Sequence, residues 1–476
     1  MNSALEYSNF IKQSYNKKVL VVNVFDIYDE FNYGFLSAES IKDFMQTAYT
    51  AWASPKIEHV LLLGSANYDY YENRQKQLPA PDHPNLVPSY GVPVSDAWFI
   101  NWNSSTFYNP LIKIGRIPAR TEEEVRNYLN KHKNCLSKGY SELNKRFLFF
   151  SGGVGNNQNE LDQLRNSNQY VIDNFIKPSP IGGIVNHFYK TLNPNTNFGP
   201  FNVSKIQNAI DSSGVFISYL GHSGTQTWDN SITEPKQLNN IVNANPLISD
   251  FGCSTAKFAE PDVTSFSELF VNGKDGQAIA YIGNTSLGFT SSSIVAPKLF
   301  YETILKDSVL NIADALNKTK VKLLTQYSSS DVNKIFSLTN SLIGDPIISL
   351  KVPPKPNLNI STNDVSFTPP KVTNQDDSVK CTIRYKNLGR TINKNFTATI
   401  KDNYNSSVIF DRNITRKIPL FMDSLVIFIP IKNKPGKHKI LVQLDIEKNI
   451  DELNENDNNT EISLVVTNSN SSFKKL

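Results

Sequence analysis

Two stretches of this 476-residue chain, GVFISYLGHSG at Gly214–Gly224 and PLISDFGCS at Pro246–Ser254, share one pattern. In each, an apolar strand ends in a glycine that is followed by a reactive side chain, His222 in the first and Cys253 in the second. Ligands of open α/β sheets bind at the carboxyl ends of the strands. If the two strands are neighbours, an imidazole and a thiol meet at that edge, where a base can convert the thiol to a nucleophilic thiolate.

Each motif alone has an ordinary explanation. A single cysteine at a strand end is most often a small buried apolar residue, and a single histidine is most often structural. Two strand-end motifs about 30 residues apart are more specific. We therefore expect the two strands to be adjacent and parallel, joined by a right-handed crossover over Ser223–Asn245 whose helix is Lys236–Asn243.

Around these strands, short apolar runs alternate with amphipathic helices from Lys18 to about Leu350. Helices are expected at Ser37–Ala51 and Thr121–Lys133. The alternation predicts an α/β fold with mainly parallel sheets and flanking helices, here in two subdomains, residues 1–143 and 144–350. The expected strands are Val19–Val24, His59–Leu63, Ile112–Ile114, Arg146–Phe150, Val215–Leu220, Pro246–Asp250 and Ala278–Ile282.

The hydrophobic pattern of the sequence changes after a proline-rich linker, KVPPKPN at Lys351–Asn357. Short alternating strands separated by turns then run from Leu358 to Val466, which predicts an all-β sandwich of immunoglobulin type. The expected strands are Val379–Tyr385, Phe396–Ile400, Ser424–Ile429 and Lys439–Leu444. The tail at 467–476, rich in Asn and Ser, is expected to be disordered.

Composition excludes several classes of function. The net charge of +4 is spread along the chain, so nucleic acid is not an expected partner. The three cysteines are too few and too far apart for a disulfide framework or a CxxC metal site. No catalytic metal or cofactor is expected. The acidic run DELNENDNN, Asp451–Asn459, offers oxygen ligands for a structural calcium ion. It lacks the loop spacing of an EF-hand, so a solvated turn is the favoured interpretation.

The two motifs and several other segments resemble the gingipain-type cysteine peptidases, peptidase family C25 of the caspase clan. The sandwich resembles bacterial adhesion-type immunoglobulin-like modules. The resemblance covers about 330 residues. The matching segments are IYDEFNYG (27–34), VLLLGSANYDY (60–70), VSDAWF (94–99), IGRIPART (114–121), YLGHSGTQTW (219–228), PLISDFGCSTAKF (246–258) and IGDPIISL (343–350).

The resemblance implies a role for each site residue. Cys253 is then the nucleophile and His222 the general base, with the backbone amides of Ser223 and Cys253 as the oxyanion hole. Trp228 falls where gingipains also have a tryptophan, so it is a candidate for the substrate cleft, with plain packing as the alternative. Asp250 is expected to be a surface turn residue.

The sequence also departs from the family. Gingipain-type enzymes usually have glycine after the histidine, where this chain has Ser223. They also carry an acidic residue after the strand near Phe150, where this chain reads SGGVGNN. Two later residues are candidates to substitute: Glu160 as the acid that supports the histidine, and Asp162 at the substrate cleft. A solvated helix start is nevertheless the favoured interpretation of both residues. The remaining histidines and cysteines are expected to be structural.

These observations favour an endopeptidase that works through a Cys–His dyad and an acyl-enzyme. Two alternatives stay open. One is a sorting peptidase or transpeptidase of the type IX secretion system, which attaches cargo to surface lipopolysaccharide. The other is a catalytically weak surface-binding module. Protein substrates, surface or secretion partners of the sandwich, and a secreted or surface location in a Gram-negative bacterium are what the resemblance implies. Since Met1–Lys18 is polar and is no signal peptide, the chain is expected to be a piece of a longer exported protein.

Overall fold

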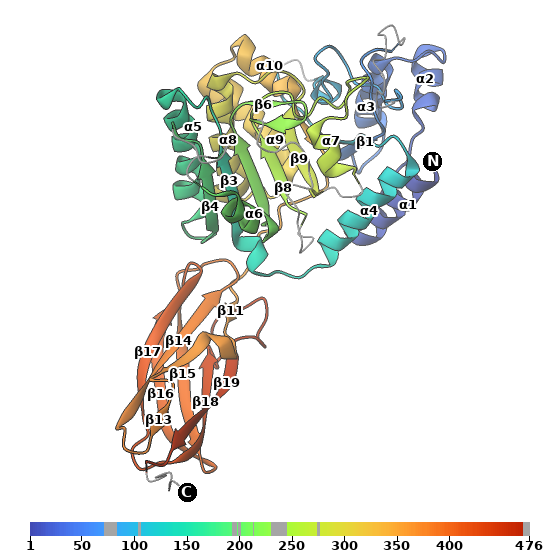
Figure 1. Cartoon of the computed structure of the whole chain (residues 1–476). Coiled ribbons are helices and arrows are strands. Elements are labelled where there is room, and N and C mark those ends of the chain that lie inside the picture. Colours follow the sequence, from blue (N-terminus) through green and yellow to red (C-terminus); the bar gives the residue numbers. More distant parts are fainter. Residues whose placement is uncertain are drawn as a thin grey trace, which may run out of the picture. The chain divides into compact units, whose positions relative to one another are not determined.

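The computed structural model divides into two compact units (Figure 1). The first comprises Met1–Gly139, Arg146–Phe175 and Val185–Lys351, and the second comprises Tyr140–Lys145, Ile176–Ile184 and Val352–Leu476. The structure describes residues 1–70, 83–102, 106–192, 198, 201–212, 214–229, 245–273 and 277–469.

The first unit is built on an eight-stranded sheet with the order β1-β2-β10-β9-β8-β5-β3-β4 (Figure 1). The pair β9–β10 is antiparallel, and the pairs β1–β2, β2–β10, β8–β9, β5–β8 and β3–β5 are parallel. The mainly parallel α/β sheet that the sequence predicted is therefore confirmed. The strands are β1 His59–Leu63, β2 Lys113–Ile117, β3 Arg146–Ser151, β4 Ile184–Tyr189, β5 Phe216–Leu220, β8 Leu247–Asp250, β9 Ala280–Asn284 and β10 Asn340–Ile343.

Helices flank this sheet (Figure 1). Both expected helices are present, α3 with Ser37 and α4 with Thr121 as N-cap residues. The helices are α1 Asn2–Tyr15, α2 Val24–Asn32, α3 Ala38–Ala51, α4 Glu122–Ser137, α5 Gln158–Val171, α6 Val203–Asp211, α7 Phe266–Val271, α8 Thr290–Tyr301, α9 Ile312–Lys322 and α10 Asp331–Thr339. None of the helices in the described residues is long and apolar enough to cross a membrane.

Two sequence-based expectations differ from this architecture. The expected strand Val19–Val24 does not form, because Asn23 caps a helix that begins at Val24, its side chain accepting from the amide of Phe25. The two expected subdomains also share one sheet. Strand β10, from the closing segment of the α/β region, lies between β2 and β9 and so joins the two halves.

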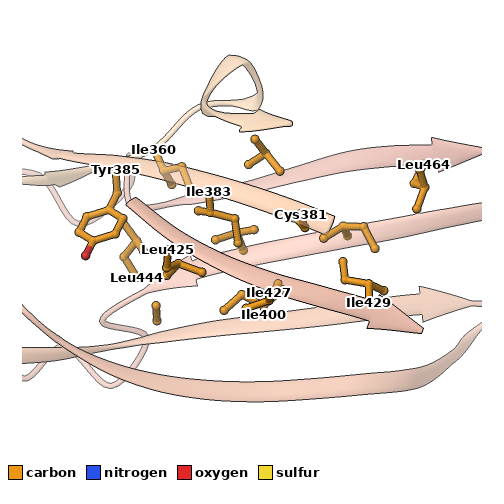
Figure 2. Close-up of a cluster of buried hydrophobic side chains, with 14 of the residues drawn as sticks. Ile360, Cys381, Ile383, Tyr385, Ile400, Leu425, Ile427, Ile429, Leu444 and Leu464 are labelled. Atoms are coloured by element: carbon orange, nitrogen blue, oxygen red, sulfur yellow. The ribbon is translucent and has the colours of Figure 1, made fainter. Parts of the chain in front are cut away.

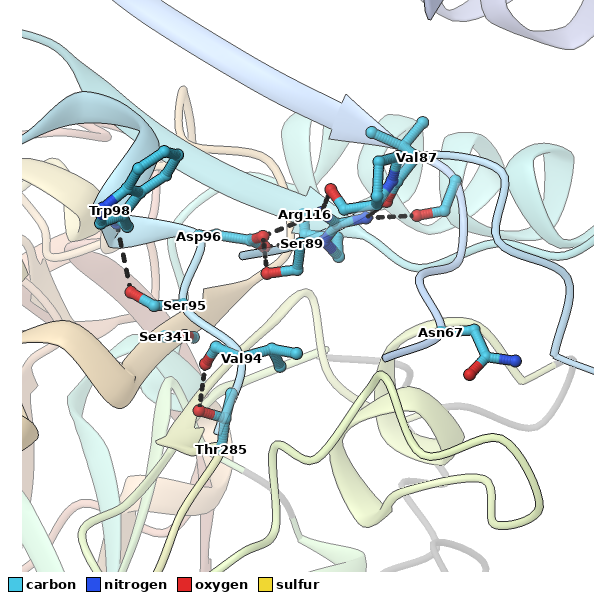
Figure 3. A network of polar contacts seen from close by, with 12 residues as sticks. Asn67, Val87, Ser89, Val94, Ser95, Asp96, Trp98, Arg116, Thr285 and Ser341 are labelled. Atoms are coloured by element: carbon cyan, nitrogen blue, oxygen red, sulfur yellow. Dashed lines mark hydrogen bonds and ion pairs between the residues drawn. The ribbon is translucent and has the colours of Figure 1, made fainter. Parts of the chain in front are cut away.

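A buried ion pair fixes the loops at the β1–β2 end of the sheet (Figure 3). Arg116 is fully buried and forms a two-pronged contact with Asp96, at 2.7 Å from Nε and 2.8 Å from Nη2. Its Nη1 also donates to the carbonyl oxygens of Gly64 and Val87. Gly64, Asp96 and Arg116 belong to three of the segments by which the chain resembles gingipains, so the pair links those segments. Arg116 also satisfies backbone carbonyls that would otherwise be buried without a donor.

The second unit is the predicted immunoglobulin-like sandwich. One sheet consists of β11 Leu358–Asn359, β12 Val365–Thr368, β14 Ser378–Asn387 and β17 Met422–Pro430, and the other of β13 Val372–Thr373, β15 Asn395–Tyr404, β16 Ser407–Lys417, β18 Gly436–Leu444 and β19 Asn459–Thr467. Alternate side chains of β14, β15, β17, β18 and β19 fill an apolar core between the sheets (Figure 2). Thr467 thus ends a strand, and residues 470–476 of the expected disordered tail lie outside the described residues.

The second unit also includes residues from before the linker. Lys145 is 1% exposed, and its Nζ donates to the carbonyl oxygens of Asn387, Gly389 and Leu420. The amide of Thr391 likewise donates to Pro180 O at 2.8 Å. The sandwich therefore has its own apolar core, but its polar contacts extend beyond the predicted boundary at Leu358.

Candidate active site

The two strand-end motifs that carry His222 and Cys253 lie on adjacent strands. Strands β5 and β8 pair in parallel, with Tyr219 opposite Asp250. His222 follows β5 and Cys253 follows β8, so both side chains belong to the carboxyl edge of the sheet, as expected. The crossover helix expected at 236–243 lies outside the described residues.

His222 is held by a carboxylate. Its ring is 56% exposed, and Nε2 lies 2.6 Å from Oε1 of Glu160. Because a carboxylate only accepts, this nitrogen carries the proton and Nδ1 is left for other chemistry. Glu160 stands in the first turn of α5, which Asn157 caps. The structure thus places Glu160 against the histidine rather than leaving it as a solvated helix start.

Cys253 has a protein environment that keeps its thiol neutral. Burial raises the pKa of the Cys253 thiol, and the charge of Asp250 acts in the same direction. The amide of Gly288 donates to Sγ at 3.2 Å, which only partly opposes this effect. Within the described residues no hydrogen bond or ion pair joins the His222 ring to the sulfur. A base must therefore approach before the sulfur becomes a nucleophile.

Asp250 is not the surface residue that the sequence suggested. It is 0% exposed, and its Oδ2 accepts hydrogen bonds from Trp228 Nε1 at 2.9 Å, Tyr281 OH at 3.1 Å and Thr255 Oγ1 at 2.8 Å. Its Oδ1 accepts from the amide of Gly252 at 2.7 Å. Burial nevertheless raises the pKa of Asp250 to about 6. The carboxylate thus fixes the turn before Cys253.

Ser223 bridges the two motifs. The amide of Cys253 donates to Ser223 Oγ at 2.7 Å, and this hydroxyl donates to Cys253 O at 2.9 Å. A Cβ on Gly252 would come within 2.3 Å of Ser223 Oγ, so only glycine fits between them. The Cys253 amide, expected to bind an oxyanion, is therefore engaged by the serine that follows His222.

Trp228 does not line a cleft. It is 0% exposed and stacks on Tyr219, with ring centroids 4.7 Å apart. Burial of the indole is tolerated because its N–H donates to the buried carboxylate of Asp250. The packing alternative is therefore the correct one. Asp162 is exposed on α5, where it accepts a hydrogen bond from Gln158 at 2.7 Å. In the described part of the chain, nothing ties Asp162 to Cys253.

The other reactive side chains have structural surroundings. His132 is buried between the hydroxyls of Tyr7 and Tyr15, and His438 is buried against Asp402. Cys381 belongs to the sandwich core, where burial raises its pKa to about 12. The described residues contain no group of three or more His, Cys, Asp or Glu that could hold a metal ion. A calcium ion at Asp451–Asn459 stays a prediction.

Sequence reasoning missed two groups that shape the site. Asp250 was visible at the end of its strand, but its partners come from distant positions that no local pattern connects. Gly288 is separated from Cys253 by 35 positions. The sequence hinted at Gly288 only by placing a glycine in the loop after the expected strand Ala278–Ile282.

Comparison with known proteins gives a consistent result. A family model described as peptidase family C25 matches residues 1–351. The crystal structure of the Arg-specific cysteine proteinase gingipain R is similar, with a TM-score of 0.56 and 15% identity over 98% of this chain and 96% of that chain. A complex of Porphyromonas gingivalis RgpB pro- and mature domains gives a TM-score of 0.57 and 15% identity over 98% of each chain. The sequence matches no curated protein.

The raised pKa of Asp250 predicts a distinctive pH dependence. Its folded value of about 6 exceeds the value of about 3.9 in an unfolded chain, so ionisation favours unfolding. The stability that Asp250 contributes is fully present below about pH 4 and is lost as the pH rises through about 6. Asp250→Asn removes this titration. The unfolding free energy of wild type minus that of D250N is therefore expected to fall by about 3 kcal/mol between about pH 4 and 7, measured by urea denaturation.

Asp345→Asn is the matched control. Asp345 is buried at the end of β10, where burial raises its pKa to about 6 and Tyr7 OH donates to it at 2.6 Å. It should show the same pH-dependent difference but leave the alkylation rate of Cys253 unchanged, whereas D250N should alter that rate. A wild-type minus D250N difference that is independent of pH would contradict the raised pKa.

Proposed function

Because the chain belongs to peptidase family C25, we propose that it is a cysteine endopeptidase in which Cys253 attacks a peptide carbonyl and His222 transfers the proton. The observation that carries this proposal is the position of the two residues at the carboxyl ends of adjacent parallel strands. Protein substrates follow from the family, and their sequence preference is a separate question.

The proposed cycle begins with a neutral thiol. Glu160 holds Nε2–H of His222, so Nδ1 is the nitrogen that takes the proton from Cys253 as the ring moves toward the sulfur. The thiolate attacks the carbonyl, and the Glu160 carboxylate stabilises the imidazolium that forms. The imidazolium then gives its proton to the leaving amine. Water, deprotonated by the same ring, hydrolyses the acyl-enzyme and regenerates the thiol.

Ser223 adds a step to this scheme. The oxyanion that forms on the substrate needs the Cys253 amide, and in the free protein this amide donates to Ser223 Oγ. We propose that the Ser223 hydroxyl turns away when substrate binds, so that the amide exchanges one acceptor for another. An oxyanion is the stronger acceptor because it is charged, which makes the exchange favourable in the transition state.

A transpeptidase is the alternative within the same chemistry. An amine in place of water would resolve the acyl-enzyme, as in a sorting peptidase of the type IX secretion system that attaches cargo to surface lipopolysaccharide. Mass analysis of products formed with an added amine separates the two outcomes. The contact between Glu160 and His222 argues against the third possibility, a binding module without catalysis. A secreted or surface location, with surface or secretion partners for the sandwich, is proposed from the family resemblance.

Glu160→Gln tests the supporting role of the carboxylate. The substitution keeps the size of the side chain but removes the charge that stabilises the imidazolium. We expect kcat/KM for a peptide substrate to fall at least about tenfold while the melting temperature stays nearly unchanged. Asp331→Asn is the control, since Asp331 likewise stands in the first turn of a helix but is exposed and lies on α10, away from the histidine. Equal activities of wild type and E160Q would remove Glu160 from the mechanism.

Ser223→Ala tests the proposed exchange of acceptors. In the variant, the Cys253 amide has no hydroxyl to release before it binds the oxyanion. The activation free energy therefore no longer includes the breaking of that hydrogen bond, which is worth about 1 kcal/mol. We expect kcat to rise about fivefold in steady-state assays. Ser249→Ala is the control, because it removes a buried hydroxyl of β8 that bonds to Ser218. A fall in kcat for S223A would mean that the hydroxyl assists catalysis instead.

A further inference from the structure

A pocket of about 200 Å³ lies on the β1–β2 side of the carboxyl edge. We refer to it as the Leu287 pocket. We propose that it is a subsite for an uncharged, apolar substrate side chain close to the scissile bond, an inference that rests on the proposed peptidase function. The lining residues that carry the argument are Val92, Val94, Lys257, Ala259, Glu260 and Leu287.

The walls of the Leu287 pocket come from the loops that hold Cys253. Leu287 precedes Gly288, whose amide lies 3.2 Å from the sulfur. Ser286, the residue before Leu287, accepts a hydrogen bond at its carbonyl oxygen from the amide of Ser254 at 2.8 Å. Lys257, Ala259 and Glu260 follow Cys253 on the same loop. A peptide bonded to the sulfur therefore has this pocket directly beside it.

The pocket is preformed. Thr285 Oγ1 donates to Val94 O at 2.6 Å, which ties the loop after β9 to the opposite wall (Figure 3). Two residues beyond Val94, Asp96 is locked by the buried side chain of Arg116. Because both walls are anchored to buried groups, binding does not have to order them first, and less affinity is lost.

The chemistry of the lining selects an apolar group. Val94 and Ala259 are buried, whereas Val92 and Leu287 at the rim are 76% and 69% exposed. A side chain that fills the pocket removes these two apolar groups from water. The charges that line it, Lys257 and Glu260, pair with each other at 3.2 Å. A charged substrate side chain would lose its own hydration and meet an ion pair that is already neutral.

Selectivity of cleavage tests the assignment. The full chain is incubated with internally quenched peptides that carry Leu, Asp or Lys at each position around one cleavable bond. At one position, wild type is expected to cleave the Leu peptide at least about tenfold faster than the Asp or Lys peptide. Leu287→Lys should reduce this preference about tenfold, because it removes an apolar wall and adds a charge. Leu111→Lys, at an exposed leucine outside the pocket lining, is the matched control and should change nothing.

A second variant weakens the preference for Leu over Asp without altering the apolar rim. Glu260→Gln leaves the Lys257 charge without its carboxylate, so the Asp peptide should gain about tenfold relative to the Leu peptide at that position. Glu302→Gln, which breaks a separate pair with Lys306, is its control. Melting temperatures check that each variant is folded.

The outcomes separate the two proposals. Active L287K and E260Q variants with wild-type selectivity at every position would overturn the subsite and leave the peptidase intact. A wild-type chain that cleaves none of the peptides and whose Cys253 is not labelled by a peptidyl ketone would overturn the peptidase, and the subsite with it.

Discussion

The buried carboxylate of Asp250 is the constraint on which the candidate site depends. Its two oxygens hold the indole of Trp228, in the hairpin after His222, and the amide of Gly252, in the turn before Cys253. One charged group therefore sets the spacing of the two strand ends. The hydrogen bonds to this carboxylate do not fully offset the loss of hydration, since the pKa of Asp250 remains raised. The chain keeps a group that is unfavourable at neutral pH, as expected where geometry matters more than stability.

In the proposed mechanism, the free protein combines a positioned base with an unactivated nucleophile. Glu160 orients His222, yet burial keeps Cys253 protonated and the amide that would bind an oxyanion is bonded to Ser223. Substrate binding then has to move the imidazole and displace the hydroxyl. The Leu287 pocket supplies a source of binding energy next to these movements, and binding energy used in this way raises the rate of the chemical step.

The sequence predicted the features that depend on local pattern. The strands at 216–220 and 247–250 were recognisable because an apolar run ended in glycine. Their parallel adjacency was expected because a base has to reach the thiol, and the segment between them is long enough for a right-handed crossover. Features that depend on contacts between distant residues could not be read in this way. Trp228 was a cleft candidate from the family resemblance, with packing as the alternative, and the choice between them depended on whether Asp250 is buried. The apolar run at 19–24 predicted a strand, but the cap at Asn23 starts a helix there. Both halves share one sheet because β10 lies between β2 and β9, and no local sequence pattern indicates this position.

The proposed mechanism requires that His222 and Cys253 act as a catalytic pair. This is tested by treating the folded chain with peptidyl acyloxymethyl ketones and locating the label by peptide mass mapping. We expect labelling of Cys253 ahead of Cys135 and Cys381, and a large loss of rate in His222→Ala. Because the pKa of the Cys253 thiol is raised, its labelling by the simple alkylator iodoacetamide should increase with pH beyond neutrality. Equal labelling of the three cysteines, or a rate at Cys253 that is unchanged in H222A, would contradict the proposed mechanism.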